Sequence, residues 1–394
     1  MKGRSGKKTL TGIALAVGLM ASPPLASAEE VAASEQEAEG IVFGLDLFPY
    51  VGTSSALPEA PRVFSFNLVG GLSGGIRVFE FGGALNLSTG DVRGVQVGGA
   101  ANINRARRAG VQVGGALNVN GGDVSGVGVG GAANINGGDV RGVQVGGALN
   151  LNGKGFEGVQ VGGALNLNRG DVEGVQVSGG ANITGGDFRG LQVGGALNLT
   201  RGDMHGLQIG GVNITGGEAR GFQVGVVNVA RGEHAGIAAV GIYRGGYVYP
   251  EVDLSDEGVV QAGVRHGAGA FYHSYSVGTQ AFGRDEGQGP GLALSIRMGW
   301  RAALSEALEF SLDAGATSLI GLDGQNPYSL FKVRPMVAVG LGEHLALFGG
   351  PTLTLDVANA SGEALPEGLI GGWMLGDQVQ LRPGATVGLR VFTR

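Results

Sequence analysis

The sequence predicts an all-β protein: a parallel β-solenoid of about ten coils of 15 or 16 residues, then a C-terminal antiparallel β-sheet or small β-barrel. Two observations carry this prediction. One sequence segment, clearest at Gly142–Asn152, recurs at a fixed short spacing, which is the signature of stacked repeats. Within that segment, apolar side chains alternate with small or polar ones at a period of two, which indicates strands rather than helices.

Two amide columns organise the repeats. Aligned copies share a central asparagine, spaced by 16 residues and finally twice by 15, at Asn86, Asn102, Asn118, Asn134, Asn150, Asn166, Asn182, Asn198, Asn213 and Asn228. A glutamine column, with Gly128 in its one gap, runs through Gln96, Gln112, Gln144, Gln160, Gln176, Gln192, Gln208 and Gln223. In a parallel stack each amide donates to one neighbour and accepts from the other, so we predict two hydrogen-bonded ladders. A second polar column follows from Ser88 to Thr215, and we expect the Val, Leu and Ile columns to fill the narrow core.

The alternative fold is one large antiparallel membrane β-barrel, because a strand of about ten residues can cross a bilayer. Three observations favour the solenoid. The 15-residue units lose a residue between Gln and Asn, as in 207–214; this would turn half the apolar residues of a straight strand to the wrong face, whereas a corner at the glycines absorbs it. The repeats have no aromatic girdle. Their connections are all of one length, whereas barrels alternate short turns with longer loops.

The regions before the repeats have their own compositions. Residues 1–28 predict a secretory signal peptide, with four basic residues, an apolar core and the small-residue motif Ala26-Ser27-Ala28. Residues 29–40 predict an acidic linker, residues 41–81 an N-terminal β segment that caps the stack, and residues 82–236 the repeat domain. Removing the signal peptide shifts the formal net charge from −6 to −10, which is a poor match for nucleic acid. The absence of cysteine excludes disulfides and thiolate metal sites.

The C-terminal region, residues 237–394, has a different sequence pattern from the repeats. Segments of ten or more residues with partial alternation lie at 268–283, 290–301, 307–318, 331–341, 344–355 and 384–393. Their aromatic residues lie near the segment ends, and turn-rich stretches separate them. This pattern resembles small outer-membrane β-barrels, for which about eight strands suffice. A soluble antiparallel sheet that caps the solenoid is the other interpretation.

No arrangement of residues predicts catalysis, a cofactor or a metal site. The five histidines lack metal-ligand spacing and predict surface or turn positions. The glycines at 126–131 belong to a repeat whose Gln became Gly, not to a dinucleotide loop. Arg105-Ala-Arg107-Arg108 predicts a basic surface edge. An acidic column predicts a solvated, mixed-charge corner, with calcium binding as the alternative, at Asp91, Asp123, Asp139, Asp171, Asp187, Asp203, Glu218 and Glu233.

The units GVQVGGALN and GFQVGVVNV resemble the glycine- and asparagine-rich surface repeat of bacterial exported proteins, over about residues 82–236. The resemblance implies an exported envelope protein and brings no catalytic residues. We therefore predict a non-enzymatic structural or adhesive protein at the outer membrane or surface of a Gram-negative-type bacterium, with the periplasm as another location. The main alternative is an outer-membrane pore or transporter. A carbohydrate-active solenoid enzyme is the more distant one, and any surface ligand or glycan is unidentified.

Overall fold

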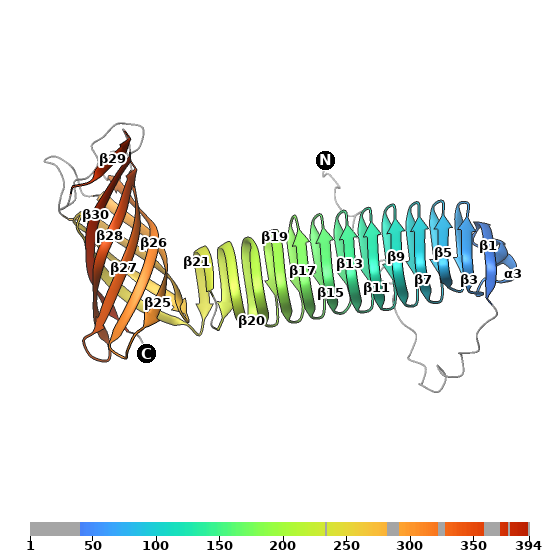
Figure 1. Cartoon of the computed structure of the whole chain (residues 1–394), viewed down its shortest axis with the longest axis horizontal. Coiled ribbons are helices and arrows are strands. Elements are labelled where there is room, and N and C mark those ends of the chain that lie inside the picture. Colours follow the sequence, from blue (N-terminus) through green and yellow to red (C-terminus); the bar gives the residue numbers. More distant parts are fainter. Residues whose placement is uncertain are drawn as a thin grey trace, which may run out of the picture. The chain divides into compact units, whose positions relative to one another are not determined.

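The computed structural model describes residues 40–232, 235–281, 291–321, 328–357, 371–376 and 379–392. The fold is all-β, with a parallel β-solenoid of about eleven turns and a closed antiparallel β-barrel of eight strands (Figure 1). The chain divides into two compact units, Met1–Thr200 and Arg201–Arg394. No helix in the described ranges is long and apolar enough to cross a membrane. The predicted signal peptide and all but the last residue of the predicted linker lie outside the described residues.

The first unit is built from coils with one long and one short strand each. Its first coil also holds β2 (Val51–Gly52) and the one-turn helix α3 (Thr53–Ala56). The long strands are β1 (Ile41–Phe48), β3 (Arg62–Asn67), β5 (Ile76–Gly82), β7 (Val92–Gly98), β9 (Arg108–Gly114), β11 (Val124–Gly130), β13 (Val140–Gly146), β15 (Phe156–Gly162) and β17 (Val172–Ser178). The short strands are β4 (Gly70–Ser73), β6 (Leu85–Ser88), β8 (Ala101–Asn104), β10 (Leu117–Asn120), β12 (Ala133–Asn136), β14 (Leu149–Asn152), β16 (Leu165–Asn168) and β18 (Ala181–Thr184), while β19 (Phe188–Thr200) runs through a whole coil.

Successive coils pair in parallel and in register. Gln144 lies opposite Gln160, and Asn150 lies opposite Asn166. Because these pairings are parallel at a spacing of 16 residues, the solenoid prediction is confirmed and the single large antiparallel barrel is wrong. Strand β1 pairs in parallel with β3, and β3 with β5, so the parallel stack extends back to Ile41.

The side chains inside the coils are the reverse of the predicted core. In β13, Gln144 is 1% exposed, while Val145 next to it is 37% exposed. The Val, Leu and Ile columns therefore face outward, and the prediction that they fill the core is wrong. One apolar column does lie inside, at the start of most long strands, where Val140, Phe156 and Val172 are buried. After it, Gly142 has a φ of 131° and an added Cβ would lie 2.1 Å from the Gly126 carbonyl oxygen, so only glycine fits this bend.

The second unit begins with coils of the same kind. They are formed by β20 (Met204–Arg231) and β21 (Ala235–Arg244), which pair in parallel. In these 15-residue coils Gln208 and Asn213 are both fully buried, whereas Ile209 is exposed. The corner between them absorbs the missing residue, as predicted.

The rest of the second unit is the barrel. Its strands pair antiparallel with their sequence neighbours, and β22 closes the ring with β30. The strands are β22 (Tyr247–Ser255), β23 (Val259–Ala268), β24 (Phe271–Gln280), β25 (Gly291–Ala303), β26 (Leu308–Gly321), β27 (Tyr328–Gly340), β28 (Leu345–Val357) and β30 (Val379–Val391), with β29 (Trp373–Gly376) paired beside β30. Of the two alternatives for the C-terminal region, the structure has the barrel.

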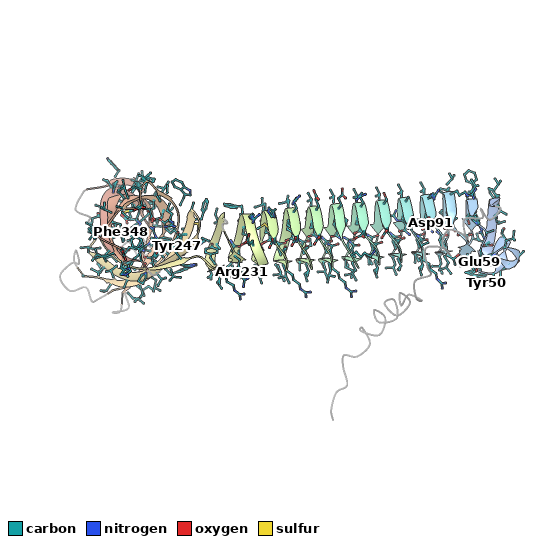
Figure 2. The ribbon with its side chains drawn as sticks, turned by 90° about the horizontal axis from the view of Figure 1, so that it is seen from below. Tyr50, Glu59, Asp91, Arg231, Tyr247 and Phe348 are labelled. Atoms are coloured by element: carbon teal, nitrogen blue, oxygen red, sulfur yellow. The ribbon has the colours of Figure 1, made fainter. Side chains whose placement is uncertain are left out.

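The barrel wall also has a polar inside and an apolar outside. Along β22, Glu251, Asp253 and Ser255 are buried, while Val252 and Leu254 between them are exposed. The same alternation holds on the other strands, and Figure 2 shows side chains on both sides of the wall. Outward aliphatic residues that are 38–51% exposed are Val252, Leu254, Val264, Val277, Leu294, Ile296, Leu312, Val333, Val337, Leu347, Leu353, Val387 and Leu389. Apolar residues reach the interior chiefly at its ends, as Met336 and Phe348 do.

Candidate functional site

The asparagine ladder lies in the solenoid interior. All eighteen predicted ladder residues, ten Asn and eight Gln, are at most 1% exposed. Asn134 donates through Nδ2 to Asn150 Oδ1 (2.9 Å), and Asn150 donates to Asn166 Oδ1 (2.8 Å). Each amide uses its second hydrogen on backbone, as Asn150 Nδ2 does on the Val161 carbonyl (2.8 Å). The predicted ladder is thus present, and each rung satisfies both its donors.

The glutamine ladder runs the opposite way. Gln160 Nε2 donates to Gln144 Oε1 (3.0 Å), toward the N-terminus, whereas each Asn donates toward the C-terminus. The second polar column crosslinks the two ladders: Asn152 Nδ2 donates to Gln144 Oε1 (3.0 Å) and to Asn168 Oδ1 (2.6 Å). The interior is therefore a connected amide network, in which buried polar groups are paired rather than orphaned.

A carboxylate ends the glutamine ladder. Glu80 lies in register with Gln96 and accepts from its Nε2 at 2.7 Å, while Asn67 Nδ2 donates to the other oxygen (3.2 Å). Because the ladder donates toward this end, its last member must accept. Burial raises the pKa of the Glu80 carboxyl to about 7, because ionisation in the core loses hydration.

The first coil closes the interior with a buried ion pair. Arg62 Nη2 donates to Asp46 Oδ2 (2.9 Å) and to the Leu72 carbonyl (2.6 Å), and both charged side chains are fully buried. Asp46 Oδ1 accepts the backbone N–H of Ser54 (2.8 Å), at the start of α3. The ion pair lies in the first coil of the described residues, where the interior amides have no preceding described coil to bond.

The gap in the glutamine column has a structural cause. Arg108 replaces the apolar residue of its column, and its side chain lies inside the stack, donating to the carbonyls of Gly110 (2.8 Å) and Val127 (2.9 Å). A Cβ on Gly128 would lie 3.5 Å from Arg108 Nη2. A glutamine side chain at 128 would therefore meet the guanidinium. The predicted basic surface edge is wrong for Arg108, which is 3% exposed and whose pKa burial lowers to about 10.

The acidic column is an exposed corner with a backbone role. Asp123 Oδ1 accepts the N–H of Asp139 (2.9 Å), and Asp139 Oδ1 accepts that of Gly155 (2.9 Å). Lys154 lies 3.7 Å from Asp139 and 3.9 Å from Asp123. Within the described residues no group of three or more His, Cys, Asp and Glu could hold a metal ion. Glu233 of this column lies outside the described residues.

Two histidines meet where the last coil contacts the barrel wall. His266 and His273 are opposite each other on β23 and β24, with ring centroids 6.0 Å apart. Tyr243 of β21 lies with its hydroxyl 2.8 Å from His273 Nδ1, and Gly241 N donates to Tyr275 OH (3.0 Å). The predicted surface or turn position is wrong for His273, which is fully buried on the outer side of the barrel. This packing stabilises a junction, and His234 lies outside the described residues.

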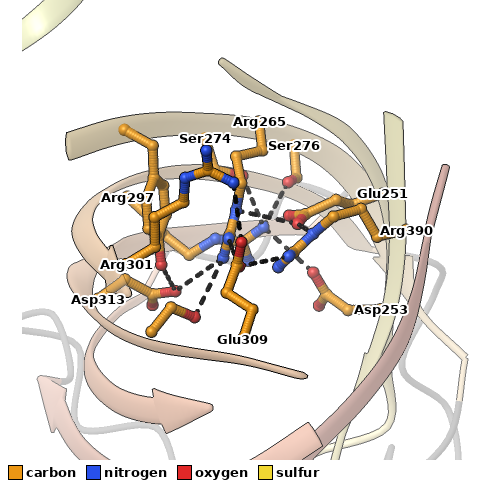
Figure 3. A network of polar contacts seen from close by, with 12 residues as sticks. Glu251, Asp253, Arg265, Ser274, Ser276, Arg297, Arg301, Glu309, Asp313 and Arg390 are labelled. Carbon is orange, nitrogen blue, oxygen red and sulfur yellow. Dashed lines mark hydrogen bonds and ion pairs between the residues drawn. The ribbon is translucent and has the colours of Figure 1, made fainter. Parts of the chain in front are cut away.

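Ion pairs fill the barrel interior at its short-turn end (Figure 3). Glu251 Oε1 lies 2.6 Å from Arg390 Nε and 3.0 Å from Arg265 Nε. Glu309 joins the same two arginines at 2.6 and 3.1 Å and binds Arg301 at 2.9 Å. A single carboxylate thus serves several guanidinium groups, as is typical of a network rather than of isolated pairs.

Further pairs continue the network along the interior. Asp313 accepts from Arg334 Nε (2.7 Å) and Nη2 (3.0 Å), as well as from Tyr272 OH (2.9 Å). Arg297 Nη2 donates to Asp253 Oδ2 (3.1 Å) and Ser276 Oγ (2.7 Å).

A second cluster lies toward the other end. Glu257 binds Lys332 Nζ (2.7 Å) and Arg382 Nη2 (2.8 Å), and Arg382 also pairs with Asp256 and Asp356. In the described barrel these ion pairs involve seven basic and seven acidic side chains, so they balance formally. The basic ones are Arg265, Arg297, Arg301, Lys332, Arg334, Arg382 and Arg390; the acidic ones are Glu251, Asp253, Asp256, Glu257, Glu309, Asp313 and Asp356.

Sequence reasoning missed this network. The segments that became β22 and β23 were not singled out as strands, and the charges of the C-terminal region were not assigned to an interior. The available signal was charged residues at alternate positions within a strand, as in Glu251-Val-Asp253 and Lys332-Val-Arg334. Chemically, mutual neutralisation leaves these groups suited to holding the barrel together rather than to proton transfer.

Comparison with family models, with curated proteins and with solved structures finds no match for this chain.

Proposed function

We propose that this chain is a non-enzymatic structural protein of a bacterial outer membrane, in which the barrel is the membrane anchor and the solenoid has the structural role. The observation that carries the proposal is the barrel's distribution of side chains. Outer-membrane strands alternate apolar-out with polar-in, and the barrel strands do so with aliphatic residues outside and paired charges inside. Their lengths of 9–14 residues are sufficient for a tilted crossing of the hydrocarbon core.

The filled interior argues against the pore or transporter alternative. An eight-stranded barrel has an interior just wide enough for side chains to fill. Here Arg297 reaches across it to Asp253, Arg265 and Arg390 reach across it to Glu309, and Arg334 pairs with Asp313 on the neighbouring strand. Opening a channel through this lumen would require these ion pairs to separate and leave their charges uncompensated. A stable anchor is therefore the better interpretation.

The connections suggest which side of the membrane the solenoid occupies. At one end of the barrel, two residues join β23 to β24, and four join β25 to β26 and β27 to β28. At the other end, three residues join β22 to β23, ten join β24 to β25, six join β26 to β27 and 21 separate β28 from β30. Outer-membrane barrels have short periplasmic turns and longer extracellular loops. The link from β21 to β22 enters at the short-turn end, so we place the solenoid on the periplasmic side; this supports a structural role and not adhesion to external surfaces.

Single-cysteine labelling tests the proposal, because the chain has no cysteine of its own. Gly371→Cys lies at the long-loop end, where an added Cβ meets nothing within 4 Å, and Ser305→Cys lies in an exposed short turn. In intact cells, a membrane-impermeant maleimide should label Gly371→Cys at once and Ser305→Cys only after the outer membrane is permeabilised. The reverse order would place the solenoid outside the cell, and equal labelling of both in a soluble fraction would refute the anchor.

A further inference from the structure

The outer surface of the solenoid is aliphatic on two opposite faces. On the long-strand face the outward columns pass through Val143 and Val145, and on the short-strand face through Leu149 and Leu151. Stacking places each such side chain about 4.8 Å from its neighbours in the next coils. Continuous aliphatic faces of this kind are unusual on a protein surrounded by water and mark an interaction surface.

Charge is confined to one edge of the coil. From Gly142 to Asn152 there is no charged residue, and the same eleven positions are uncharged in every coil from Gly94 to Thr200. The exposed charges lie instead at the opposite edge, as Asp139, Arg141, Lys154 and Glu157 do. The two faces meet at a corner of small residues, Gly146, Gly147 and Ala148 in this coil.

The backbone of that small-residue corner is hydrogen-bonded between coils. Gly147 N donates to the Gly130 carbonyl (3.1 Å), and Ala148 N and Leu149 N donate to the Ala132 carbonyl (2.8 and 3.1 Å). The neighbouring coils repeat these bonds. A segment immersed in hydrocarbon must satisfy its backbone groups internally, because no water is there to do so. With the polar side chains turned inward onto one another, both faces meet this requirement. The corner meets it for its N–H groups, while the carbonyls of Gly131 and Gly147 accept no hydrogen bond within the described residues.

The last coils continue the aliphatic surface up to the barrel. Ile237, Val240 and Ile242 of β21 are exposed, and they extend the same outward columns as Val224, Val227 and Val229. Within the second unit, Phe222 packs edge-on against Phe271 of the outer barrel wall, at a centroid distance of 6.3 Å. The surface of these last coils is therefore continuous with the wall that faces lipid under the proposed function.

We infer that the solenoid is itself a lipid-binding element, which immerses its small-residue corner and both aliphatic faces edge-on in one membrane leaflet, with the charged edge at the headgroups. The dimension supports one leaflet: five residues of strand, 142–146, span about 16 Å, close to half of a hydrocarbon core of about 30 Å. A second copy of the chain packed on one face would leave the other face in water, whereas lipid covers both. This inference rests on the proposed function, since it needs a membrane into which the barrel inserts.

The test uses the full chain in phosphatidylcholine–phosphatidylglycerol vesicles with brominated acyl chains. An environment-sensitive fluorophore is attached to single cysteines: Val145→Cys on a face, Ala148→Cys at the small-residue corner, Asp139→Cys at the charged edge and Ile296→Cys on the barrel wall. We expect the first two to be quenched like Ile296→Cys, and to react with an impermeant maleimide at least about tenfold more slowly than Asp139→Cys, because hydrocarbon excludes the polar reagent.

The outcomes separate this inference from the proposed function. Quenching at Ile296→Cys with none at Val145→Cys and Ala148→Cys would overturn the lipid-binding solenoid and leave the anchor standing. No quenching at Ile296→Cys either would overturn both. Oxidative crosslinking between two copies of the Val145→Cys chain, without quenching, would also overturn the inference, because the face would then be covered by a second protomer.

Discussion

The solenoid and the barrel have the same inside-out distribution of side chains but different interiors. The solenoid repeats are lined by neutral amides, whereas the barrel is lined by arginines and carboxylates. The reason is periodicity. In a parallel stack each residue lies beside its own equivalent, so the lining group must be both donor and acceptor, as Asn and Gln are. A column of stacked carboxylates would repel at about 4.8 Å, whereas antiparallel barrel strands bring unlike residues together and allow ion pairs.

The largest effect should come from breaking an ion pair of the barrel. Arg334→Met leaves the Asp313 carboxylate without its two hydrogen bonds from Arg334, and an uncompensated buried charge costs about 3–5 kcal/mol. The free energy of unfolding is measured by urea titration of the full chain in micelles. Arg141→Gln, which loses only an exposed contact with Glu157, should change it by less than about 0.5 kcal/mol. Equal losses would show that the interior pairs are as weak as surface ones.

The end of the glutamine ladder should make the solenoid sensitive to pH. The Glu80 pKa is raised to about 7 from 4.5, so the folded state holds the proton more tightly. Its stability contribution is complete below pH 4.5 and is lost as the pH rises to 7, by at most about 3 kcal/mol. Glu80→Gln places the column's own residue there and should abolish this slope. Hydrogen exchange of the first coils between pH 4.5 and 7.5 measures it, and an unchanged slope in the variant would contradict the assignment.

A single rung tests the amide interior. Asn150→Leu leaves the Asn134 donor and the Asn166 acceptor without their partner, which should cost about 1–3 kcal/mol. Asp139→Ser, at the exposed corner, removes one charged acceptor of a backbone N–H and should cost less than about 1 kcal/mol. Urea unfolding followed by circular dichroism compares the two variants. If leucine were tolerated better than serine, the assignment of inside and outside would be reversed.

The smallest expected effect is a coupling between two coils. Gly128→Gln alone should destabilise, because its side chain meets Arg108, and Arg108→Val alone should leave a void. Together they restore both column residues, so we expect a favourable interaction energy of about 1–2 kcal/mol in a double-mutant cycle. Additive effects would mean that the arginine and the glycine do not compensate each other.

The repeat spacing was enough to predict the solenoid and its ladders, but not which face lies inside. The alternation at Val143-Gln144-Val145 defines two strand faces but does not say which of them lies inside the coil. The general preference for apolar cores selects the wrong face. The unbroken Asn column was the better guide, since only buried amides need an identical neighbour. The position of Arg108 could not be foreseen, because it depends on Gly128 twenty residues later. The barrel ion pairs depend on strand register, as between Glu251 and Arg390, which no local pattern encodes.

The opposed directions of the two ladders have a consequence for the length of the protein. Asn150 donates toward the C-terminus and Gln160 toward the N-terminus, so the dipoles of these two chains of amides oppose each other. In an α-helix every peptide dipole points the same way, and the sum accumulates as partial charges at the ends. Here an inserted coil adds one rung to each chain. The second polar column, in which Asn152 donates toward the C-terminus as Asn150 does, leaves part of the dipole uncancelled. A lineage that gains or loses coils therefore changes the electrostatic field at Asp46 and Arg62 less than it would if all the amide chains ran one way.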